Sequence, residues 1–464
     1  MEKYFFEKNK YRTKLRGMVM NIDYFKKLSP SRKLILGFLL AILLGTFILM
    51  MPFSLREGEK LNFLSSLFTI VSAVCVTGLT VVDVSKIFSP AGDLVIIFFI
   101  QLGGLGVMTF SSILFLVMGK RMTFYERELL KEERNADSSG EISSFIKKLL
   151  LTVFIIESIG AIILTWEFSK EMPLNKAVFY GIFHSISAFC NAGFALFSNN
   201  LEAYKANPVI NLTIGYLITL GGIGFAVITS VIMVIRRGID RFNLTSKVAI
   251  IMSVILTFGG MILFFVLEYS NPATLGDLNF VQKVLASYFQ SVTLRTAGFN
   301  TIPLGELRNS TIFMCCILMF IGASPGSTGG GIKTTTFGVI LFYVIGIVKK
   351  KENVEIFNRR LDWEIMNRAL AILVLAITYV IIVIMLMLIA ENFSPEEIMF
   401  EVISAFGTVG LTLGITPDLT TFSKLLLIVT MFIGRLGPMT FALAIGETKK
   451  KALSKYPKEN ILVG

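Results

Sequence analysis

Apolar runs alternate with polar, charged segments along most of the chain. Because a helix needs about 20 mainly apolar residues to cross the hydrocarbon core of a bilayer, the long runs are predicted to be membrane-spanning helices. The eight predicted spans cover residues 34–51, 91–118, 145–166, 208–235, 247–267, 310–347, 369–390 and 421–446. The pattern therefore predicts an all-α polytopic membrane protein.

A shorter apolar segment lies between the two members of each pair of spans. The four short segments cover residues 61–75, 176–190, 279–292 and 396–407. Each is too short to cross a bilayer, and each ends in glycine and polar residues. Such segments are typical of re-entrant pore helices, which enter the membrane and turn back within it.

The ends of the four short segments resemble one another, which indicates an internal repeat. They read SAVCVTGLT (72–80), SAFCNAGFA (187–195), SVTLRTAGFN (291–300) and SAFGTVGLT (404–412). Three have a serine six residues before the shared glycine, and the third has one extra residue. Each shared glycine is followed 24 to 28 residues later by a glycine-rich motif, expected at the start of the next span. These second glycines are Gly103, Gly221, Gly322 and Gly434.

The repetition predicts four tandem units of helix, pore helix, filter loop and helix around a pseudo-fourfold pore. Repeats 1 to 4 are expected at residues 34–119, 145–237, 246–348 and 367–446. They are joined and flanked by an N-terminal segment at 1–33, a loop at 120–144 and a tail at 447–464.

The filter loops are the candidate binding site. Non-helical backbone at membrane depth is tolerated only where it is buried in protein or lines a water-filled path. Four loops meeting on one axis would form a ring of carbonyl oxygens, which can replace the hydration shell of a cation. Glycine gives the backbone the freedom to aim carbonyls inward, and the negative ends of the pore helices favour a cation. The predicted ligand-bearing residues are Val76, Thr77, Gly78, Asn191, Ala192, Gly193, Thr296, Ala297, Gly298, Thr408, Val409 and Gly410.

Composition and charge support a membrane protein and predict its orientation. Hydrophobic residues make up 54% of the chain and charged residues 16%, with a net charge of +12. Of the 44 Lys and Arg residues, 32 lie in five polar segments that the positive-inside rule assigns to the cytosol. Both termini are therefore expected in the cytosol, and the net charge gives no reason to expect nucleic acid as a partner. The five segments are 1–33, 120–148, 236–247, 349–368 and 447–464.

A polar run in repeat 3, GASPGSTGGGIKTTT (322–336), interrupts an otherwise apolar span. It resembles a phosphate-binding loop, but that motif needs a glycine directly before its lysine and a strand in front. Here Ile332 precedes Lys333, and the preceding segment is a predicted membrane helix. We instead predict a movable gate loop (322–336) across the ion path below the filter loops. Its central residues are Gly326, Ser327, Thr328, Gly329, Gly330 and Gly331.

Two basic residues lie in predicted spans away from the span ends, where charges are expensive and usually face a cavity or a partner. Arg435 in the last span is predicted to raise a barrier to permeating cations as part of the gate. Lys333 either belongs to the same gate or extends its ammonium group toward an interface.

Four other polar side chains each have two candidate roles. Glu157 could pair helices or couple ions, and His184, the only histidine, could be a structural histidine or a pH sensor. Asp83 and Glu401 could attract cations at the outer mouth or serve as hydrogen-bond acceptors.

The motifs VTGL, NAGF, TAGF and TVGL, each after a pore helix, resemble the four degenerate selectivity filters of the Trk/Ktr/HKT potassium transporter superfamily. Longer stretches such as LFTIVSAVCVTGLTVVD, SYFQSVTLRTAGFN and MFIGRLGPMTF are similar to the bacterial Ktr membrane subunit, and the resemblance covers residues 30–464. In sodium-preferring relatives the first filter position is often serine, so Gly78 favours potassium.

The resemblance implies potassium uptake across a bacterial cell membrane by a lipid-embedded homodimer with one pore in each protomer. It further implies potassium at the filter carbonyls, a gate formed by the gate loop with Arg435, and sodium as a candidate activator. Control is expected from a separate cytosolic ring of RCK (KTN) nucleotide-binding subunits, and no covalent cofactor is expected.

Three other functions remain to be weighed. An enzyme would need catalytic groups, but the chain has a single histidine and no HExxH motif. A secondary solute carrier would be expected to have two inverted repeats and coupling carboxylates at the midplane, rather than four pore helices. A pore of the same fold that admits sodium or ammonium remains open.

Overall fold

The computed structural model describes residues 30–106, 142–237, 242–350 and 353–445. The predictions for the N-terminal segment 1–33, the loop 120–144 and the tail 447–464 lie outside these residues, apart from a few positions at their edges.

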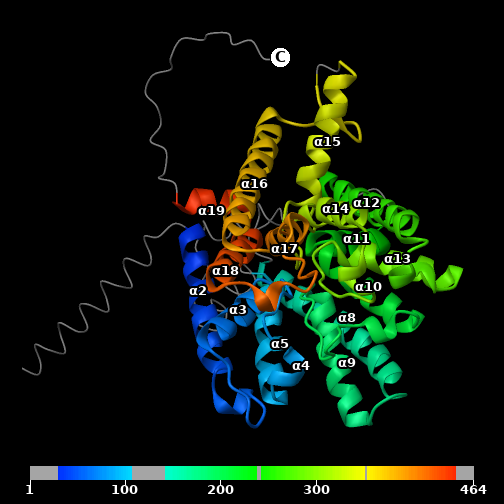
Figure 1. Ribbon diagram of the computed structural model, residues 1–464. Coiled ribbons are helices and arrows are strands. Elements are labelled where there is room, and N and C mark those ends of the chain that lie inside the picture. The colour runs from blue at the N-terminus through cyan, green and yellow to red at the C-terminus, as the bar shows by residue number, and fades with distance from the viewer. Residues whose placement is uncertain (1–29, 107–141, 238–241, 351–352, 446–464) are drawn as a thin grey trace, which may run out of the picture.

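The described chain is mainly helical (Figure 1), and each predicted repeat spans several of its helices. Repeat 1 contains α2 (Pro30–Leu49), α3 (Phe63–Val74), the short α4 (Val84–Ile87) and α5 (Pro90–Gly104). Repeat 2 contains α8 (Ile142–Phe168), α9 (Leu174–Phe189), α10 (Pro208–Gly222) and α11 (Phe225–Arg237). Repeat 3 contains α12 (Leu244–Glu268), α13 (Phe280–Thr293), α14 (Asn309–Phe320) and α15 (Thr334–Val348). Repeat 4 contains α16 (Trp363–Ala390), α17 (Pro395–Gly407), α18 (Thr421–Leu436) and α19 (Pro438–Ile445).

Several predicted spans are interrupted rather than continuous. Among the described residues, three helical segments are long and apolar enough to cross a membrane: Lys148–Phe168, Leu244–Glu268 and Trp363–Ala390. The second span of repeat 2 breaks after α10, where Gly224 has φ 97°, and that of repeat 4 breaks at Gly437, with φ 84°. Glycine in this left-handed region commonly ends a helix. The glycine-rich motifs therefore end the first half of a span, and the expectation that they begin one was wrong.

These motifs allow helices to pack closely against the pore helices. A Cβ atom added at Gly103, Gly221 or Gly434 would overlap a backbone carbonyl at or near the end of the pore helix in the same repeat. Those carbonyls belong to Val74, Phe189 and Phe406, respectively. The glycine recurs because in each of these repeats the helix packs against the pore helix at this position, and only a residue without a side chain fits there.

The four helical groups close into a ring. The helix that follows the filter loop in each group contacts the pore helix of the next group, in the pairs α5–α9, α10–α13, α14–α17 and α18–α3. The last described helix returns to the first, since α19 contacts α2, and Figure 1 shows the red α19 beside the blue α2. The pore helices therefore lie around a common centre.

A small β-hairpin departs from the all-α prediction. Strands β1 (Glu355–Ile356) and β2 (Arg359–Arg360) pair antiparallel between α15 and α16. Ile356 is fully buried in a cluster that includes Val248 and Met252 of α12. Figure 1 shows α15 and α16 extending beyond the rest of the bundle on one side.

The outer surface is apolar, as a lipid-facing surface should be. Phe154 and Ile162 of α8 are 68% and 69% exposed, and Ile389 of α16 is 81% exposed. Side chains of this size would be buried in a water-soluble protein of the same fold, whereas hydrocarbon lipid solvates them.

Candidate ion-binding site

The four filter loops share one backbone conformation. In each, the residue two positions before the glycine has a positive φ: 56° at Val76, 60° at Asn191, 70° at Thr296 and 50° at Thr408. The glycines are also left-handed, with φ of 99°, 69°, 77° and 87° in chain order. A positive φ at a β-branched residue is a genuine outlier, so its recurrence in three of the loops indicates a conformation imposed by the surroundings.

The four glycines meet at the centre of the ring. A Cβ atom would come within 2.6 Å of the Ala192 carbonyl oxygen if added at Gly78, and within 2.8 Å of the Ala297 carbonyl oxygen if added at Gly193. At Gly298 it would lie 2.5 Å from the Val409 oxygen, and at Gly410 it would overlap the Thr77 oxygen. Each glycine thus faces the carbonyl of the next repeat, and repeat 4 closes on repeat 1.

Four backbone carbonyl oxygens, one from each filter loop, form this ring. Within the described parts of the chain, no hydrogen bond reaches the carbonyl oxygens of Thr77, Ala192, Ala297 or Val409. A buried carbonyl without a partner is costly unless a ligand takes that place. A ring of such oxygens at the negative ends of four helices is suited to a desolvated cation.

Hydroxyl groups on the pore helices brace the filter loops. Ser72 Oγ accepts from the Gly78 amide at 2.9 Å, and Ser404 Oγ accepts from the Gly410 amide at 3.1 Å. In repeat 2, Ser187 Oγ instead donates to the Phe194 carbonyl at 2.8 Å. These are the serines that recur six residues before the glycine.

Repeat 3 uses a residue that the sequence comparison missed. Thr293 Oγ1 donates to the Phe299 carbonyl at 2.6 Å and so braces this loop. Ser291, which the sequence aligned with the other serines, donates to the Thr257 carbonyl of α12. The SVTLRTAGFN motif carries a second hydroxyl, Thr293, two residues after Ser291, and this was the feature of the sequence that could have identified the bracing residue.

The gate loop lies directly beneath two filter loops. The Gly330 amide donates to Thr408 Oγ1 at 2.9 Å, and a Cβ atom at Gly329 would overlap Thr296 Oγ1. The loop folds back on itself, since the Gly322 amide donates to the Ile332 carbonyl at 2.8 Å.

The gate loop is also tied to the glycine turns of repeats 2 and 4. Thr328 donates its amide to the Gly221 carbonyl at 3.2 Å, and Gly331 donates to the Gly434 carbonyl at 3.2 Å. The Phe225 amide in turn donates to the Gly326 carbonyl at 2.9 Å. The loop therefore contacts several repeats at once.

The two basic side chains that were predicted to belong to the gate both donate hydrogen bonds to this loop. Arg435 donates from its two terminal nitrogens to the carbonyls of Thr328 and Gly103, joining the loop to repeat 1. Lys333 Nζ donates to the Gly329 carbonyl at 2.8 Å, so its ammonium group turns toward the loop.

Three of the other polar candidates form hydrogen bonds with neighbouring residues. His184 bonds the Tyr180 carbonyl through Nδ1 at 2.8 Å and accepts from the Leu196 amide through Nε2 at 3.3 Å, as a structural histidine does. Glu157 accepts from Gln101 at 3.4 Å between α8 and α5. Glu401 is fully buried and accepts from Thr416, whose hydroxyl also lies 3.0 Å from that of Thr412 on the wall of the outer cavity.

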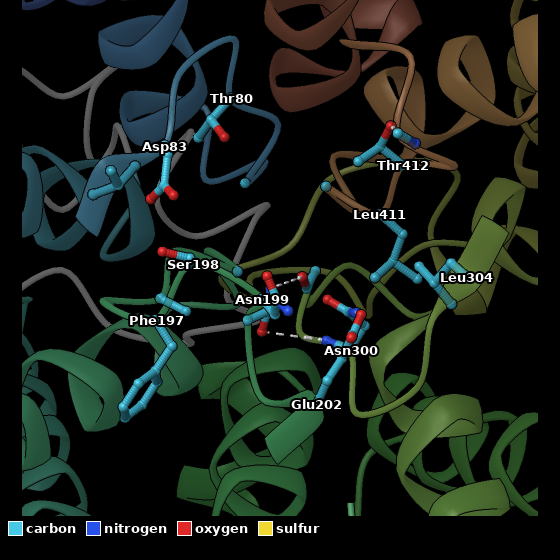
Figure 2. Close-up of a pocket in the computed structure, with 18 of the residues that line it drawn as sticks. Thr80, Asp83, Phe197, Ser198, Asn199, Glu202, Asn300, Leu304, Leu411 and Thr412 are labelled. Atoms are coloured by element: carbon cyan, nitrogen blue, oxygen red, sulfur yellow. Dashed lines mark hydrogen bonds between the residues drawn. The ribbon is translucent and has the colours of Figure 1, made fainter. Parts of the chain in front are cut away.

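A cavity of about 550 Å³ opens above the ring, and all four filter glycines line it (Figure 2). Asp83 and Glu202 contribute carboxyl groups to its wall. Partial burial acts to raise the pKa of Asp83, but hydrogen bonds from Ser85, Ser198 and Lys86 outweigh it and hold that pKa below its ordinary value. Asp83 is therefore ionised at the cavity wall, where its carboxylate also pairs with Lys86 at 3.2 Å.

Fold and site together define a multi-pass helical membrane protein with a central ring of backbone oxygens. A family model described as TrkH, cation transport protein, matches residues 30–454. The chain belongs to this family of cation transport proteins.

Several characterised proteins are similar to the chain along nearly its whole length. It is 42% identical to the Ktr system potassium uptake protein B of Bacillus subtilis, across 94% of this chain and 97% of that protein. It is 37% identical to the potassium/sodium uptake protein NtpJ of Enterococcus hirae, across 95% and 98%. The crystal structure of the potassium transporter TrkH from Vibrio parahaemolyticus matches with a TM-score of 0.71, covering 90% of this chain and 86% of that one at 17% identity, a likeness of fold.

Proposed function

We propose that this chain takes up potassium through a channel-like pore formed by four repeats around a pseudo-fourfold axis. The observation that carries the proposal is the closed ring in which each filter glycine faces a carbonyl of the next repeat that accepts no hydrogen bond from the described residues. Carbonyl oxygens in such a ring substitute for the water around a permeating cation. The name of the 42% identical relative, a potassium uptake protein, supports potassium as the cargo.

The gate loop closes this pore in the proposed mechanism. It lies beneath the filter loops, and Arg435 and Lys333 hold two of its carbonyls. A cation entering from the filter would meet these two positive charges, which raise its energy at that point. Opening then requires the loop to move aside and release its hydrogen bonds to the neighbouring repeats.

Regulation and assembly follow from the resemblance to the Ktr membrane subunit. We propose a homodimer in the bacterial cell membrane, controlled by a cytosolic ring of RCK (KTN) nucleotide-binding subunits, with sodium as a candidate activator. Two relatives are named as members of a Ktr system, which supports a second component. Both termini are expected in the cytosol because the positive-inside rule assigns the basic segments to that side.

A pore that also admits sodium is the second candidate. It is favoured by the relative named a potassium/sodium uptake protein, which is 37% identical. Gly78 argues for potassium, because a serine side chain at this position would lie against the Ala192 carbonyl and change the ring.

Complementation of a bacterium that lacks potassium uptake tests the function. Expression of the chain with a cognate RCK ring is expected to restore growth at low potassium, and Gly78→Ser is expected to reduce it. Gly259→Ala is a matched control, because nothing lies within 4 Å of a Cβ atom at that position on α12. Failure of the wild type to restore growth despite normal membrane expression would reject potassium uptake. Parallel uptake of sodium would favour the second candidate.

A further inference from the structure

One filter glycine differs from the other three in the environment of its carbonyl. Gly298 O accepts a hydrogen bond from Asn200 Nδ2 at 3.3 Å. Across the ranges that the structure describes, no hydrogen bond reaches the carbonyl oxygens of Gly78, Gly193 or Gly410. The donor comes from repeat 2, whereas its acceptor belongs to repeat 3. The outer end of the filter is therefore asymmetric.

Asn200 is held in place by its own backbone and by a second asparagine. Its φ of 52° lies in the left-handed region, which asparagine tolerates better than most residues. Its Oδ1 accepts from the Asn300 amide at 3.4 Å, and the Asn300 carbonyl accepts from the Leu201 amide at 3.0 Å. The side-chain amide is thus oriented with oxygen toward Asn300 and nitrogen toward Gly298.

A third side chain completes this arrangement. Asn300 Nδ2 donates to Glu202 Oε1 at 2.9 Å and to the Ile302 carbonyl at 3.1 Å. We refer to Asn200, Asn300 and Glu202 as the asparagine clasp. Figure 2 shows Glu202 and Asn300 adjacent on the wall of the cavity, and Asn200 lines the same cavity. An ion entering the filter must pass these residues.

We propose that Asn200 is a positioning residue that sets the ion preference of the filter through the Gly298 carbonyl; this inference rests on the proposed pore function. A carbonyl oxygen has two lone pairs, so one can accept from Asn200 while the other faces the ion. A bond from outside the ring opposes movement of the oxygen toward the axis. A smaller ion such as sodium requires that inward movement, whereas potassium does not. The clasp therefore disfavours sodium.

The test measures potassium and sodium flux in liposomes for the full chain assembled with its cognate RCK ring. Asn200→Gly removes the amide and retains a residue suited to a positive φ. Asn200→Asp keeps an oxygen for the Asn300 amide and loses the donor to Gly298. Asn199→Asp is the matched control: it adds the same charge at an exposed neighbour whose side chain forms no hydrogen bond within the described chain.

Both Asn200 variants are expected to lower the ratio of potassium to sodium flux by about two- to tenfold, the change that one hydrogen bond produces. The ratio for Asn199→Asp should equal that of the wild type. A purely structural role would lower the maximal flux of both ions together, and an unchanged ratio in the two Asn200 variants would overturn the inference. A wild type that conducts potassium but does not discriminate would overturn this inference alone, whereas a wild type without flux would reject the proposed function as well.

Discussion

At the scale of single residues, the site depends on positions whose partners lie in other repeats. Arg435 reaches carbonyls of repeats 3 and 1, and Asn200 reaches a carbonyl of repeat 3. The sequence indicated Arg435, because a charge inside an apolar span is unusual. It gave no sign of Asn200, since an asparagine in a polar outer loop is ordinary and its acceptor lies 98 residues away.

Arg435→Ala is expected to increase potassium flux through the purified chain. The substitution removes two hydrogen bonds from a guanidinium group to the gate loop and repeat 1, and it removes the positive charge below the filter. A hydrogen bond to a charged group contributes about 1.5–3 kcal/mol, so the open fraction should rise by about tenfold or more while the pore is mostly closed. Flux into liposomes measures this change.

Arg368→Ala is the control, because it removes an exposed arginine from α16 without touching the gate loop. Its flux should match the wild type. Equal or lower flux in Arg435→Ala, with normal folding, would contradict the role of this residue in closure.

At the scale of elements, hydropathy predicted where apolar helices lie but not where they break. An apolar run continues across Gly224 and across Gly437, so a sliding average cannot separate one span from two half-helices. The recurrence of the glycines carried information that hydropathy lacked. Their reason became apparent only in the packed structure, where three of them lie against pore-helix carbonyls.

Gly221→Ala is expected to destabilise the protein, because the new methyl group would overlap the Phe189 carbonyl at the end of α9. Relieving such overpacking typically costs about 1–3 kcal/mol. Gly259→Ala is the control. Its methyl group meets no atom within 4 Å, and replacing a glycine inside a helix by alanine stabilises the folded protein by about 0.5–1 kcal/mol. Melting temperatures in detergent should fall for the first variant and stay level or rise for the second. Equal melting temperatures would show that α10 does not need the close approach.

At the scale of the whole molecule, four copies of one motif predicted four loops at a common centre. The copies did not predict the order of contact, in which each repeat faces the next and repeat 4 closes on repeat 1. The departure from symmetry was partly visible: only repeat 3 extends its glycine turn into a polar run. The asparagine clasp between repeats 2 and 3 was not visible, because it depends on the fold of two separate outer loops.

The whole molecule is expected to lie in the membrane with the cavity above the ring facing outward and the hairpin facing the cytosol, and cysteine labelling can test this orientation. All four native cysteines are buried, with exposures between 0% and 2%, so the wild type should react little with a membrane-impermeant thiol reagent. Asn199→Cys introduces a thiol at the cavity above the ring, and Asn358→Cys introduces one at the exposed turn of the hairpin. Because the hairpin lies within the basic segment 349–368, the positive-inside rule places it in the cytosol. In intact cells Asn199→Cys should be labelled, while Asn358→Cys should be labelled only after permeabilisation. The reverse pattern would invert the proposed orientation and place the gate loop on the outer side of the filter.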